Sequence, residues 1–459
     1  MKRHVLILAA GKSKRMKSKT SKVLHPILGK TVLEYVVDLA ENSNSDNTVV
    51  IVGKDHDDIK EALKEHVVSY AVQEEQLGTG HAVMCAEDNL DQGTTLILCG
   101  DGPCLRPETL EALYEDHSKA KRDLTVLSLE LEDPFGYGRL IKEGDTLFRI
   151  TEEKDATDEE RLVKEINTGI LLVDTSLLKE ELKNLDNDNA QGQYYITDLI
   201  ELFNKRDLKV GSFQMKDASE FIGINDRYQL YEATEIIKKR INEKWMREGV
   251  TMINPDSIYI DASVVIESDA TLLPGTILRG HCLIKEDAVI GPASTLTNVI
   301  VGKGSRVEHS VLMDSEIGEE TTVGPFAYLR PGSKVGSHCK VGDFVEVKNS
   351  SLGDNTKVSH LSYVGDSDVG RDVNIGCGVV FVNYDGKNKN RTTIDDEAFI
   401  GCNVNLISPV HVHGGAYIAA GTTVTEDVPE DALVIGRCRQ EIKEKKALGR
   451  TKHDRGKKK

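Results

Sequence analysis

The chain has 459 residues, too many for a single hydrophobic core, so we expect two domains joined by a connector. Its formal net charge of −17 at pH 7 argues against a nucleic-acid coat or an anionic membrane surface as the main partner. We therefore predict no nucleic-acid partner and no membrane partner. Any basic residues that bind phosphate must then be local clusters in an acidic protein.

We expect neither a leader peptide nor a membrane span. The apolar run at 5–10 is shorter than the core of a signal peptide and is followed at once by Gly and charged residues. No run approaches the length of a membrane span. The eight cysteines are scattered without a CxxC pair, which favours reduced thiols over a disulfide framework or a zinc site. These features predict a cytoplasmic protein.

The first half of the chain alternates apolar runs with amphipathic stretches. The expected strands are 5–10, 48–52, 94–99, 124–129 and 168–173, and the expected helices are 31–41, 57–65, 107–119 and 195–204. This alternation predicts a Rossmann-like α/β domain, in which a mostly parallel sheet is covered by helices on both faces. Ligands of such domains bind at the carboxyl ends of the strands.

Two turns follow expected strands of this domain. The first, LAAGKSKRM at 8–16, lets backbone N–H groups approach a phosphate, and Lys12, Arg15 and Lys22 would supply positive charge. It lacks the GK[ST] ending of a Walker A motif and does not match GxGxxG, so a purely structural turn stays open. Asp101 follows the strand at 94–99, where it could be a ligand of a hard cation, although Asp-Gly is also an ordinary turn signal.

A single amphipathic helix is expected to connect the two halves. It runs over 226–247, with an apolar stripe formed by Leu230, Ala233, Ile237, Ile241 and Trp245. We therefore expect domains at 1–225 and 251–459, with a helical linker at 226–250.

A six-residue repeat dominates the second half, from near Ile266 to Val424. Branched aliphatic residues recur at Ile284, Ile290, Val301, Val307, Ile317, Val323, Leu329, Val335, Val341 and Val347. A small residue often stands four places after the aliphatic one, as Ala288 does after Ile284. This period suits a triangular coil with three flat sides, of which roughly nine turns of about 18 residues would fit. A β-sandwich with accidental spacing is the alternative, but the repeat resumes in phase after each insertion.

The repeat stops at 382–393, where the segment NYDGKNKNR is inserted. Insertions in a solenoid form loops, and such loops often build the binding face. His360 lies upstream of this loop, and a histidine is suited to take a proton from an amine at neutral pH. Most exposed histidines have no catalytic role, so this residue alone does not identify a reaction.

Further motifs appear in a recognisable order along the chain. They are LAAGKSKRM at 8–16, QLGTGHA at 76–82, GDGP at 100–103, GYGR at 136–139, EINTG at 165–169 and GIND at 223–226. Together they resemble the sugar-phosphate nucleotidylyltransferases. With the hexapeptide coil, nearly all 459 residues are similar to the bacterial bifunctional family that joins an N-acetylglucosamine-1-phosphate uridylyltransferase to a glucosamine-1-phosphate N-acetyltransferase. The resemblance implies acetylation of glucosamine 1-phosphate by acetyl-CoA, followed by coupling of the product to UTP with release of pyrophosphate.

For the first half, the resemblance implies one Mg²⁺ per uridylyltransferase site, held by Asp101 and Asn225. It also implies that Arg15 and Lys22 act on the phosphates as catalytic residues. The residues implied to bind UDP-N-acetylglucosamine are Leu8, Ala9, Ala10, Gly11, Lys22, Gln73, Gly78, Thr79, Gly138, Glu152, Asn167 and Asn225. The chain departs from the family at Cys99, where Tyr or Ser is more common, and we expect a backbone contact there that preserves activity.

For the second half, the resemblance implies a left-handed parallel β-helix in a homotrimer, with acetyltransferase sites between subunits. His360, in SHLSYVGD at 359–366, matches the catalytic base, and Glu346 is implied to orient its surroundings. The residues implied to bind glucosamine 1-phosphate are Arg330, Lys348, Tyr363 and Asn374. Those implied to bind acetyl-CoA are Cys377, Asn383, Tyr384, Cys402, Ala420 and Arg437, with Lys389 in the same region. Without the resemblance, Arg330 and Lys348 would be read as solvated surface charge.

Two further departures lie in the acetyl-CoA region, where Cys377 and Cys402 replace a common Ala and a common Ser. We therefore expect the acetyltransferase to be sensitive to thiol reagents. The basic tail at 443–459 is interpreted as a disordered solubilising end, or as electrostatic help for the phosphates of CoA.

Two alternative functions are considered. In one, the chain is a nucleotidylyltransferase whose coil only oligomerises or regulates, and His360 with the 382–393 insertion argues against it. In the other, the chain is a non-catalytic sensor of sugar nucleotides built from the same modules. The presence of Arg15, Lys22, Asp101 and Asn225 argues against that hypothesis.

Overall fold

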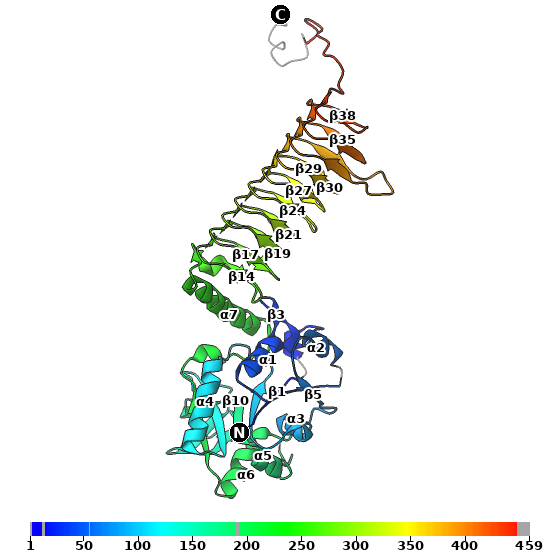
Figure 1. Ribbon diagram of the computed structural model, residues 1–459. Coiled ribbons are helices and arrows are strands. Elements are labelled where there is room, and N and C mark those ends of the chain that lie inside the picture. Colours follow the sequence, from blue (N-terminus) through cyan, green and yellow to red (C-terminus); the bar gives the residue numbers. More distant parts are fainter. Residues whose placement is uncertain (1, 12–13, 55, 190–191, 448–459) are drawn as a thin grey trace, which may run out of the picture. The chain divides into compact units, whose positions relative to one another are not determined.

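The computed structural model describes residues 2–11, 14–54, 56–189 and 192–447 (Figure 1). Lys12, and residues 448–459 of the basic tail, lie outside the described residues. The chain divides into two compact units, Met1–Ile241 and Asn242–Lys459.

The first unit is built on a nine-stranded sheet. Its strands are β1 (Arg3–Leu8), β4 (Asn47–Val52), β5 (Ser69–Val72), β6 (Thr94–Cys99), β7 (Leu124–Glu130), β8 (Arg139–Glu143), β9 (Thr146–Thr151), β10 (Glu165–Asp174) and β11 (Val210–Gln214). The main order is β11-β7-β10-β6-β1-β4-β5, and β8 pairs with β9 and β10. Along the main order only β10 runs antiparallel to its neighbours. The predicted mostly parallel sheet is therefore confirmed.

Helices cover both faces of this sheet. They are α1 (Val32–Asn42), α2 (Asp57–Ala62), α3 (Thr79–Met84), α4 (Pro107–Ala120), α5 (Thr175–Leu182) and α6 (Leu199–Lys205). On one face, α1 and α4 pack on alternate strand residues such as Ile7. On the other face, α3, α5 and α6 pack on the intervening residues such as Leu6. Because neighbouring side chains of a strand point to opposite faces, the continuous apolar run of β1 is buried on both sides.

The expected elements of this unit are present with small shifts at their ends. Strand β1 ends at Leu8, two residues before the expected end, although Ala9 still donates its backbone N–H to Ile51 O (2.8 Å). Helix α1 begins after Thr31, which forms a capping box with Glu34. The expected helix at 195–204 is regular only over α6. The β8–β9 hairpin was not expected. A short hairpin of β2 (Pro26–Ile27) and β3 (Lys30–Thr31) completes the unit.

Helix α7 (Arg227–Arg247) follows the first sheet, close to the expected span of 226–247. Ala233 and Ile237 of its predicted apolar stripe are buried against Met16 and Ile224 within the first unit. The two compact units divide inside this helix, after Ile241. Among the described residues, no helix is both long enough and apolar enough to cross a membrane.

The second unit is a parallel β-helix whose strands stack in three ladders. The first ladder is β12 (Thr251–Met252), β15 (Thr271–Leu272), β18 (Val289–Ile290), β20 (Arg306–Val307), β22 (Thr322–Val323), β25 (Lys340–Asp343), β28 (Lys357–His360), β31 (Asn374–Ile375), β34 (Phe399–Ile400), β37 (Tyr417–Ile418) and β39 (Leu433–Val434). The second ladder is β13 (Tyr259–Ile260), β16 (Ile277–Arg279), β19 (Thr295–Val301), β21 (Val311–Ile317), β23 (Tyr328–Leu329), β26 (Glu346–Lys348), β29 (Tyr363–Gly365), β32 (Val380–Val382), β35 (Asn405–Ile407) and β38 (Thr423–Val424). The third ladder is β14 (Val265–Ile266), β17 (Leu283–Ile284), the second halves of β19 and β21, β24 (Lys334–Val335), β27 (Ser351–Leu352), β30 (Ser367–Val369), β33 (Thr392–Ile394) and β36 (Val410–Val412).

The predicted repeat residues form the core of this coil. All ten aliphatic residues named for the repeat are at most 4 % exposed, and small partners such as Ala288 and Ser294 are fully buried. Residues one turn apart lie in register, as Leu272 does with Ile290. The first ladder has eleven strands, more than the roughly nine turns expected, because the coil extends beyond both ends of the recognised repeat.

The inserted segment forms a loop between β32 and β33 that projects from the coil, in orange in Figure 1. An antiparallel bridge between Tyr384 and Lys389 closes it. The loop therefore has its own local structure and interrupts the ladder without changing its register, because β30 and β33 still pair in parallel.

Candidate functional site

Two cavities of about 310 and 330 Å³ open at the carboxyl ends of the first unit's strands, and Cys99 and Asp101 line both of them. Asp101 follows directly after the turn that ends β6. The first cavity also contains the predicted residues Gly138, Glu152, Asn167 and Asn225. The second contains the predicted residues Leu8, Ala9, Ala10, Gly11, Lys22, Gln73, Gly78 and Thr79. The residues expected to bind the sugar and the nucleotide therefore form two adjoining compartments.

Gln73 and Gly78 shape the second cavity. Gln73 is 3 % exposed, and its amide donates to Gly78 O (3.0 Å). Gly78 has a φ of 113°, and a Cβ there would be 2.4 Å from Tyr194 O, so only glycine fits. The neighbouring Thr79 accepts the backbone N–H of Ile196 (3.1 Å). A buried amide held in this way suits recognition of the polar edge of a base.

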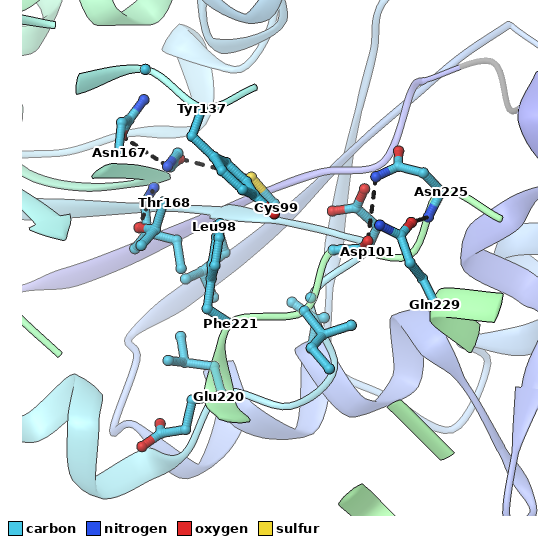
Figure 2. A pocket seen from close by; sticks show the side chains of 18 of the residues that line it. Leu98, Cys99, Asp101, Tyr137, Asn167, Thr168, Glu220, Phe221, Asn225 and Gln229 are labelled. Carbon is cyan, nitrogen blue, oxygen red and sulfur yellow. Dashed lines mark hydrogen bonds between the residues drawn. The ribbon is translucent and has the colours of Figure 1, made fainter. Parts of the chain in front are cut away.

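The first cavity presents a carboxylate and an amide at the end away from Asp101, where Figure 2 shows Asn167 and Tyr137. Asn167 accepts the N–H of Gly169 (2.9 Å) and donates its own backbone N–H to Gly138 O (2.9 Å). A Cβ on Gly138 would be 2.7 Å from the side chain of Ile150 and 3.2 Å from Glu152 Oε1. Burial raises the pKa of Glu152. Together these groups offer the donors and acceptors that sugar hydroxyls need.

Asp101 and Asn225 both contact the ammonium group of Lys22, so their oxygen atoms already surround one positive charge. This arrangement shows whether they fit a metal ion. Lys22 Nζ donates to the Asp101 carboxylate and lies 3.3 Å from Asn225 Oδ1. Arg15 Nη2 also donates to Asn225 Oδ1 (2.8 Å). Gln229 Oε1 accepts the backbone N–H of Asn225 (2.8 Å) and fixes this residue (Figure 2). Two hard oxygen atoms that converge on an ammonium group fit Mg²⁺, whose other ligands are usually waters and substrate phosphates.

Cys99 lies where the two cavities meet. Its Sγ donates to Gly169 O (3.8 Å), and burial raises the pKa of its thiol to about 12. The thiol is therefore protonated at neutral pH and acts as a small apolar group. The expected backbone contact of Cys99 stays a prediction.

His360, the last residue of β28, pairs with a residue that the sequence did not single out. Its Nδ1 is 2.6 Å from Asp343 Oδ1, and Asp343 lies directly opposite it in register at the end of β25. A carboxylate can only accept, so Nδ1 carries the proton and Nε2 of the neutral ring keeps its lone pair. The hydrogen bond to His360 holds the pKa of Asp343 below its usual value. The offset of 17 residues, about one turn of the coil, was the signal that could have revealed Asp343.

Three of the predicted sugar-phosphate residues, Arg330, Lys348 and Tyr363, lie on or beside the second ladder, whereas Asn374 lies on β31 of the first. Lys348 Nζ is 2.9 Å from Asp366 Oδ2, which also accepts from Asn383 Nδ2 (2.5 Å). Asn383 is 3.3 Å from Tyr363 Oη. Asp366 therefore contacts two predicted residues, Lys348 and Asn383, and Tyr363 joins them through Asn383, although Asp366 was not itself predicted. Its pKa is held below the usual value because its hydrogen bonds to the amides and to Lys348 outweigh its burial.

Three cations converge beside this network. Arg330 Nη1 donates to Glu346 Oε1 (2.9 Å), so the predicted Glu346 contacts the guanidinium and not His360 within the described residues. The ammonium of Lys348 lowers the pKa of Lys389, on the inserted loop, and Arg330 adds to this effect. The hydrogen bond to Asp366 raises the pKa of Lys348 itself. Cations held this close repel one another, so an anionic group bound among them would be stabilised.

Asp343 and His360 each stand two places after the last paired aliphatic residue of a first-ladder strand, and they begin a column of residues along one corner of the coil. Three predicted acetyl-CoA residues continue this column. Cys377, Cys402 and Ala420 occupy equivalent positions on successive turns, and Asn403 and Gly421 donate N–H groups to Cys377 O and Cys402 O (both 2.8 Å). At the end of the column, Arg437 donates to Ala420 O (2.7 Å). Tyr384 is on the inserted loop and donates to Gly386 O (2.7 Å), and Asn374 is half-buried on β31. A long ligand could lie along this corner.

Comparison with known proteins identifies the family. Residues 5–166 match the model of the MobA-like NTP transferase domain, and residues 314–349 match that of the bacterial transferase hexapeptide (six repeats). The chain is 48 % identical to the bifunctional protein GlmU of Clostridium botulinum strain 657 over 442 residues, 96 % of each chain. It is 50 % identical to that of Acetivibrio thermocellus, with the same coverage. The chain belongs to the GlmU family.

Membership of the GlmU family confirms the resemblance that the motifs indicated and the expected bifunctional enzyme. The chain is an enzyme of UDP-N-acetylglucosamine synthesis with uridylyl-transfer and N-acetyl-transfer activities. Both alternative hypotheses are thereby set aside: a nucleotidylyltransferase whose coil only oligomerises or regulates, and a non-catalytic sensor of sugar nucleotides.

Proposed function

We propose that the first unit couples UTP to N-acetylglucosamine 1-phosphate across its two adjoining cavities. The nucleotide would occupy the cavity of Gln73 and Gly78, and the sugar would occupy that of Glu152 and Asn167. The shared wall at Asp101 would then bring the sugar phosphate next to the α-phosphate of UTP. Aligning two anionic reactants in this way removes much of the entropic barrier to their reaction.

Lys22 and Arg15 would neutralise the reacting phosphates, as their contacts with Asp101 and Asn225 support. We propose that Asp101 and Asn225 hold Mg²⁺ when substrates bind, with Lys22 turning from Asp101 to phosphate. The ion would supply charge stabilisation at the phosphoryl oxygens. The expected release of pyrophosphate follows from attack at the α-phosphorus.

We propose that the coil transfers an acetyl group from acetyl-CoA to the amine of glucosamine 1-phosphate. His360 Nε2 would take the proton from the attacking amine, while Asp343 holds the ring in the required tautomer. Asp343 acts through His360 and is therefore a positioning residue. The cations Arg330, Lys348 and Lys389 would bind the sugar phosphate, and acetyl-CoA would lie along the corner from Cys377 to Arg437.

We propose that the enzyme is a homotrimer whose acetyltransferase sites are completed by neighbouring subunits. Next to His360, an exposed apolar column runs through Phe326, Phe344 and Leu361 on successive turns, and the ring of the half-buried His309 stacks on Phe326 (5.6 Å). The rings of Phe326 and Phe344 stack at 5.4 Å, yet both residues are more than half exposed. An exposed apolar strip of this kind is typical of a surface that another chain covers. The cytoplasmic location and the absence of nucleic-acid and membrane partners stay predictions of the sequence.

This proposal rests on one observation: the chain holds two separate sets of residues. One set is Lys22 with Asp101, and the other is His360 with Asp343. Asp101→Ala should abolish uridylyl transfer and leave acetyl transfer intact, and His360→Ala should do the reverse. Both variants are assayed for both reactions, with circular dichroism to confirm folding. Loss of both activities in either well-folded variant would overturn the two-site proposal.

A further inference from the structure

A cluster of two histidines and one aspartate lies on the third ladder of the coil, apart from the residues assigned above. It comprises Asp395, His411 and His413, whose ligand atoms all lie within 4.8 Å of one another. We propose that this cluster is a binding site for a transition-metal dication of the zinc type. Neither proposed reaction uses these three side chains, and the inference does not depend on those reactions.

The backbone of the coil fixes the three positions. Strands β33 and β36 pair in parallel with Thr393 opposite His411, so Asp395 follows its strand at the level of His413. Asp395 donates its backbone N–H to Val412 O (2.8 Å), which extends the pairing beyond the strand. Val412 is fully buried, so the histidines on either side of it point outward together. A His-x-His pair on a strand thus faces a carboxylate from the preceding turn.

The distances suit coordination by one ion. His411 Nε2 is 2.9 Å from Asp395 Oδ2, and His413 Nδ1 is 3.3 Å from the same oxygen. The centroids of the two imidazole rings are 3.8 Å apart. Ligand atoms at about 2.0–2.2 Å from a tetrahedral zinc ion lie about 3.3–3.6 Å from one another. Small side-chain rotations would therefore place the three atoms around one ion, with a remaining position for water.

The surroundings of the cluster favour a cation. Within the part of the chain that the structure describes, no lysine or arginine forms an ion pair with Asp395. Glu430 and Asp396 line the same hollow, and Asp427 accepts the backbone N–H of His411 (2.7 Å). Of these carboxylates, Asp396 is already paired with Arg371 (2.9 Å). Asp395 thus remains available to the two imidazoles, and the other acidic groups add negative potential.

The ligand set favours borderline metals over Mg²⁺. Imidazole nitrogen is a preferred ligand of zinc, nickel, cobalt and copper, whereas Mg²⁺ selects oxygen ligands and keeps several waters. A second cluster, Asp38, Glu41 and His66, offers only one imidazole, and its Asp38 is paired with Lys30 (2.6 Å). The coil cluster is therefore the stronger candidate. Because its ligands come from adjacent turns, an ion bound there would fasten the last turns of the coil together.

The test is titration of the full-length protein with Zn²⁺ by calorimetry, after removal of metals with EDTA. Exposed thiols at Cys402 and Cys438 would also bind zinc, so they are first blocked with iodoacetamide. Excess Mg²⁺ is present to occupy oxygen-rich sites. The wild-type protein is compared with the His411→Gln/His413→Gln double variant. The matched control is His281→Gln, a change of an exposed histidine on the same coil.

We expect the wild type and the control to bind one more Zn²⁺ than the double variant, or to bind it at least 100-fold more tightly. Zn²⁺ should also raise the melting temperature of the wild type, with a smaller effect in the double variant. Asp395→Asn should weaken binding while both histidines remain, which distinguishes a three-ligand site from nonspecific binding to imidazole. Equal stoichiometry and affinity in the wild type and the double variant would overturn the proposal, as would the absence of zinc binding in the wild type.

Discussion

Removal of the carboxylate beside His360 should slow acetyl transfer without weakening substrate binding. In Asp343→Ala, the 2.6 Å contact with His360 Nδ1 is lost, and the ring is no longer held with its lone pair on Nε2. Neither side chain is assigned to the phosphate or to CoA, so the two Michaelis constants should be almost unchanged. Asp343→Asn keeps an oxygen that accepts the same hydrogen bond, so it should restore most of the rate.

The expected size of this effect follows from the geometry. A hydrogen bond to a charged group is worth about 1.5–3 kcal/mol, which corresponds to about a 10- to 150-fold change in rate. The two side chains are 40 % and 56 % exposed in the single chain, and solvent weakens such a contact. We therefore expect kcat to fall about tenfold in Asp343→Ala and by less than about threefold in Asp343→Asn.

The assay follows release of CoA at saturating acetyl-CoA and glucosamine 1-phosphate, and each Michaelis constant is measured separately. Glu286→Gln is a matched control because Glu286 forms a similarly exposed ion pair with Lys303 (2.6 Å) elsewhere on the coil. Three results would refute the positioning role: an unchanged kcat in Asp343→Ala, no rescue by Asp343→Asn, or an equal loss in the control.

Three further predictions concern thiols, pH and charge. Alkylation should abolish acetyl transfer in the wild type and spare a Cys377→Ala/Cys402→Ser variant; equal loss in both would contradict a role for these thiols. Burial, and then the charges of nearby acidic groups, raise the pKa of Asp198 from 3.8 to about 6. The folded state therefore binds this proton more tightly than the unfolded state, so the wild type should lose stability as the pH rises from about 4 to 6. Asp198→Asn removes this loss, and its melting temperature should exceed that of the wild type above pH 6 but not below pH 4, as scanning calorimetry over this range can check. Lys389→Met should raise the Michaelis constant for glucosamine 1-phosphate about tenfold; an increase for acetyl-CoA alone would assign Lys389 to CoA instead.

The sequence predicted the coil in detail because each hexapeptide carries its own inward aliphatic residue. Ile284 and Val347 are both fully buried for that reason. The strands of the first unit were also predictable, because β1 and β6 are continuous apolar runs buried on both faces. The β8–β9 hairpin was missed because each of its strands is short and buries only two residues, which gives a weak apolar signal.

Site residues were predictable where they belong to a recognisable sequence motif. They were not predictable where the fold alone brings distant residues together. Asp101 stands in a recognisable GDGP motif, and in the structure it accepts a hydrogen bond from Lys22, another residue of the predicted phosphate site. Asp343, in contrast, reaches His360 only through the register of β25 and β28. The same reason hid Asp395 and its two histidines, because residues 16 and 18 positions apart become neighbours only when the coil closes.

Membership of the GlmU family means that one chain performs both transfers. The most direct measurement incubates the purified enzyme with Mg²⁺, UTP, acetyl-CoA and glucosamine 1-phosphate, and follows free CoA and pyrophosphate in the same sample. We expect both products to appear, with CoA released before pyrophosphate. Formation of pyrophosphate only when N-acetylglucosamine 1-phosphate is supplied, with no release of CoA, would contradict this expectation.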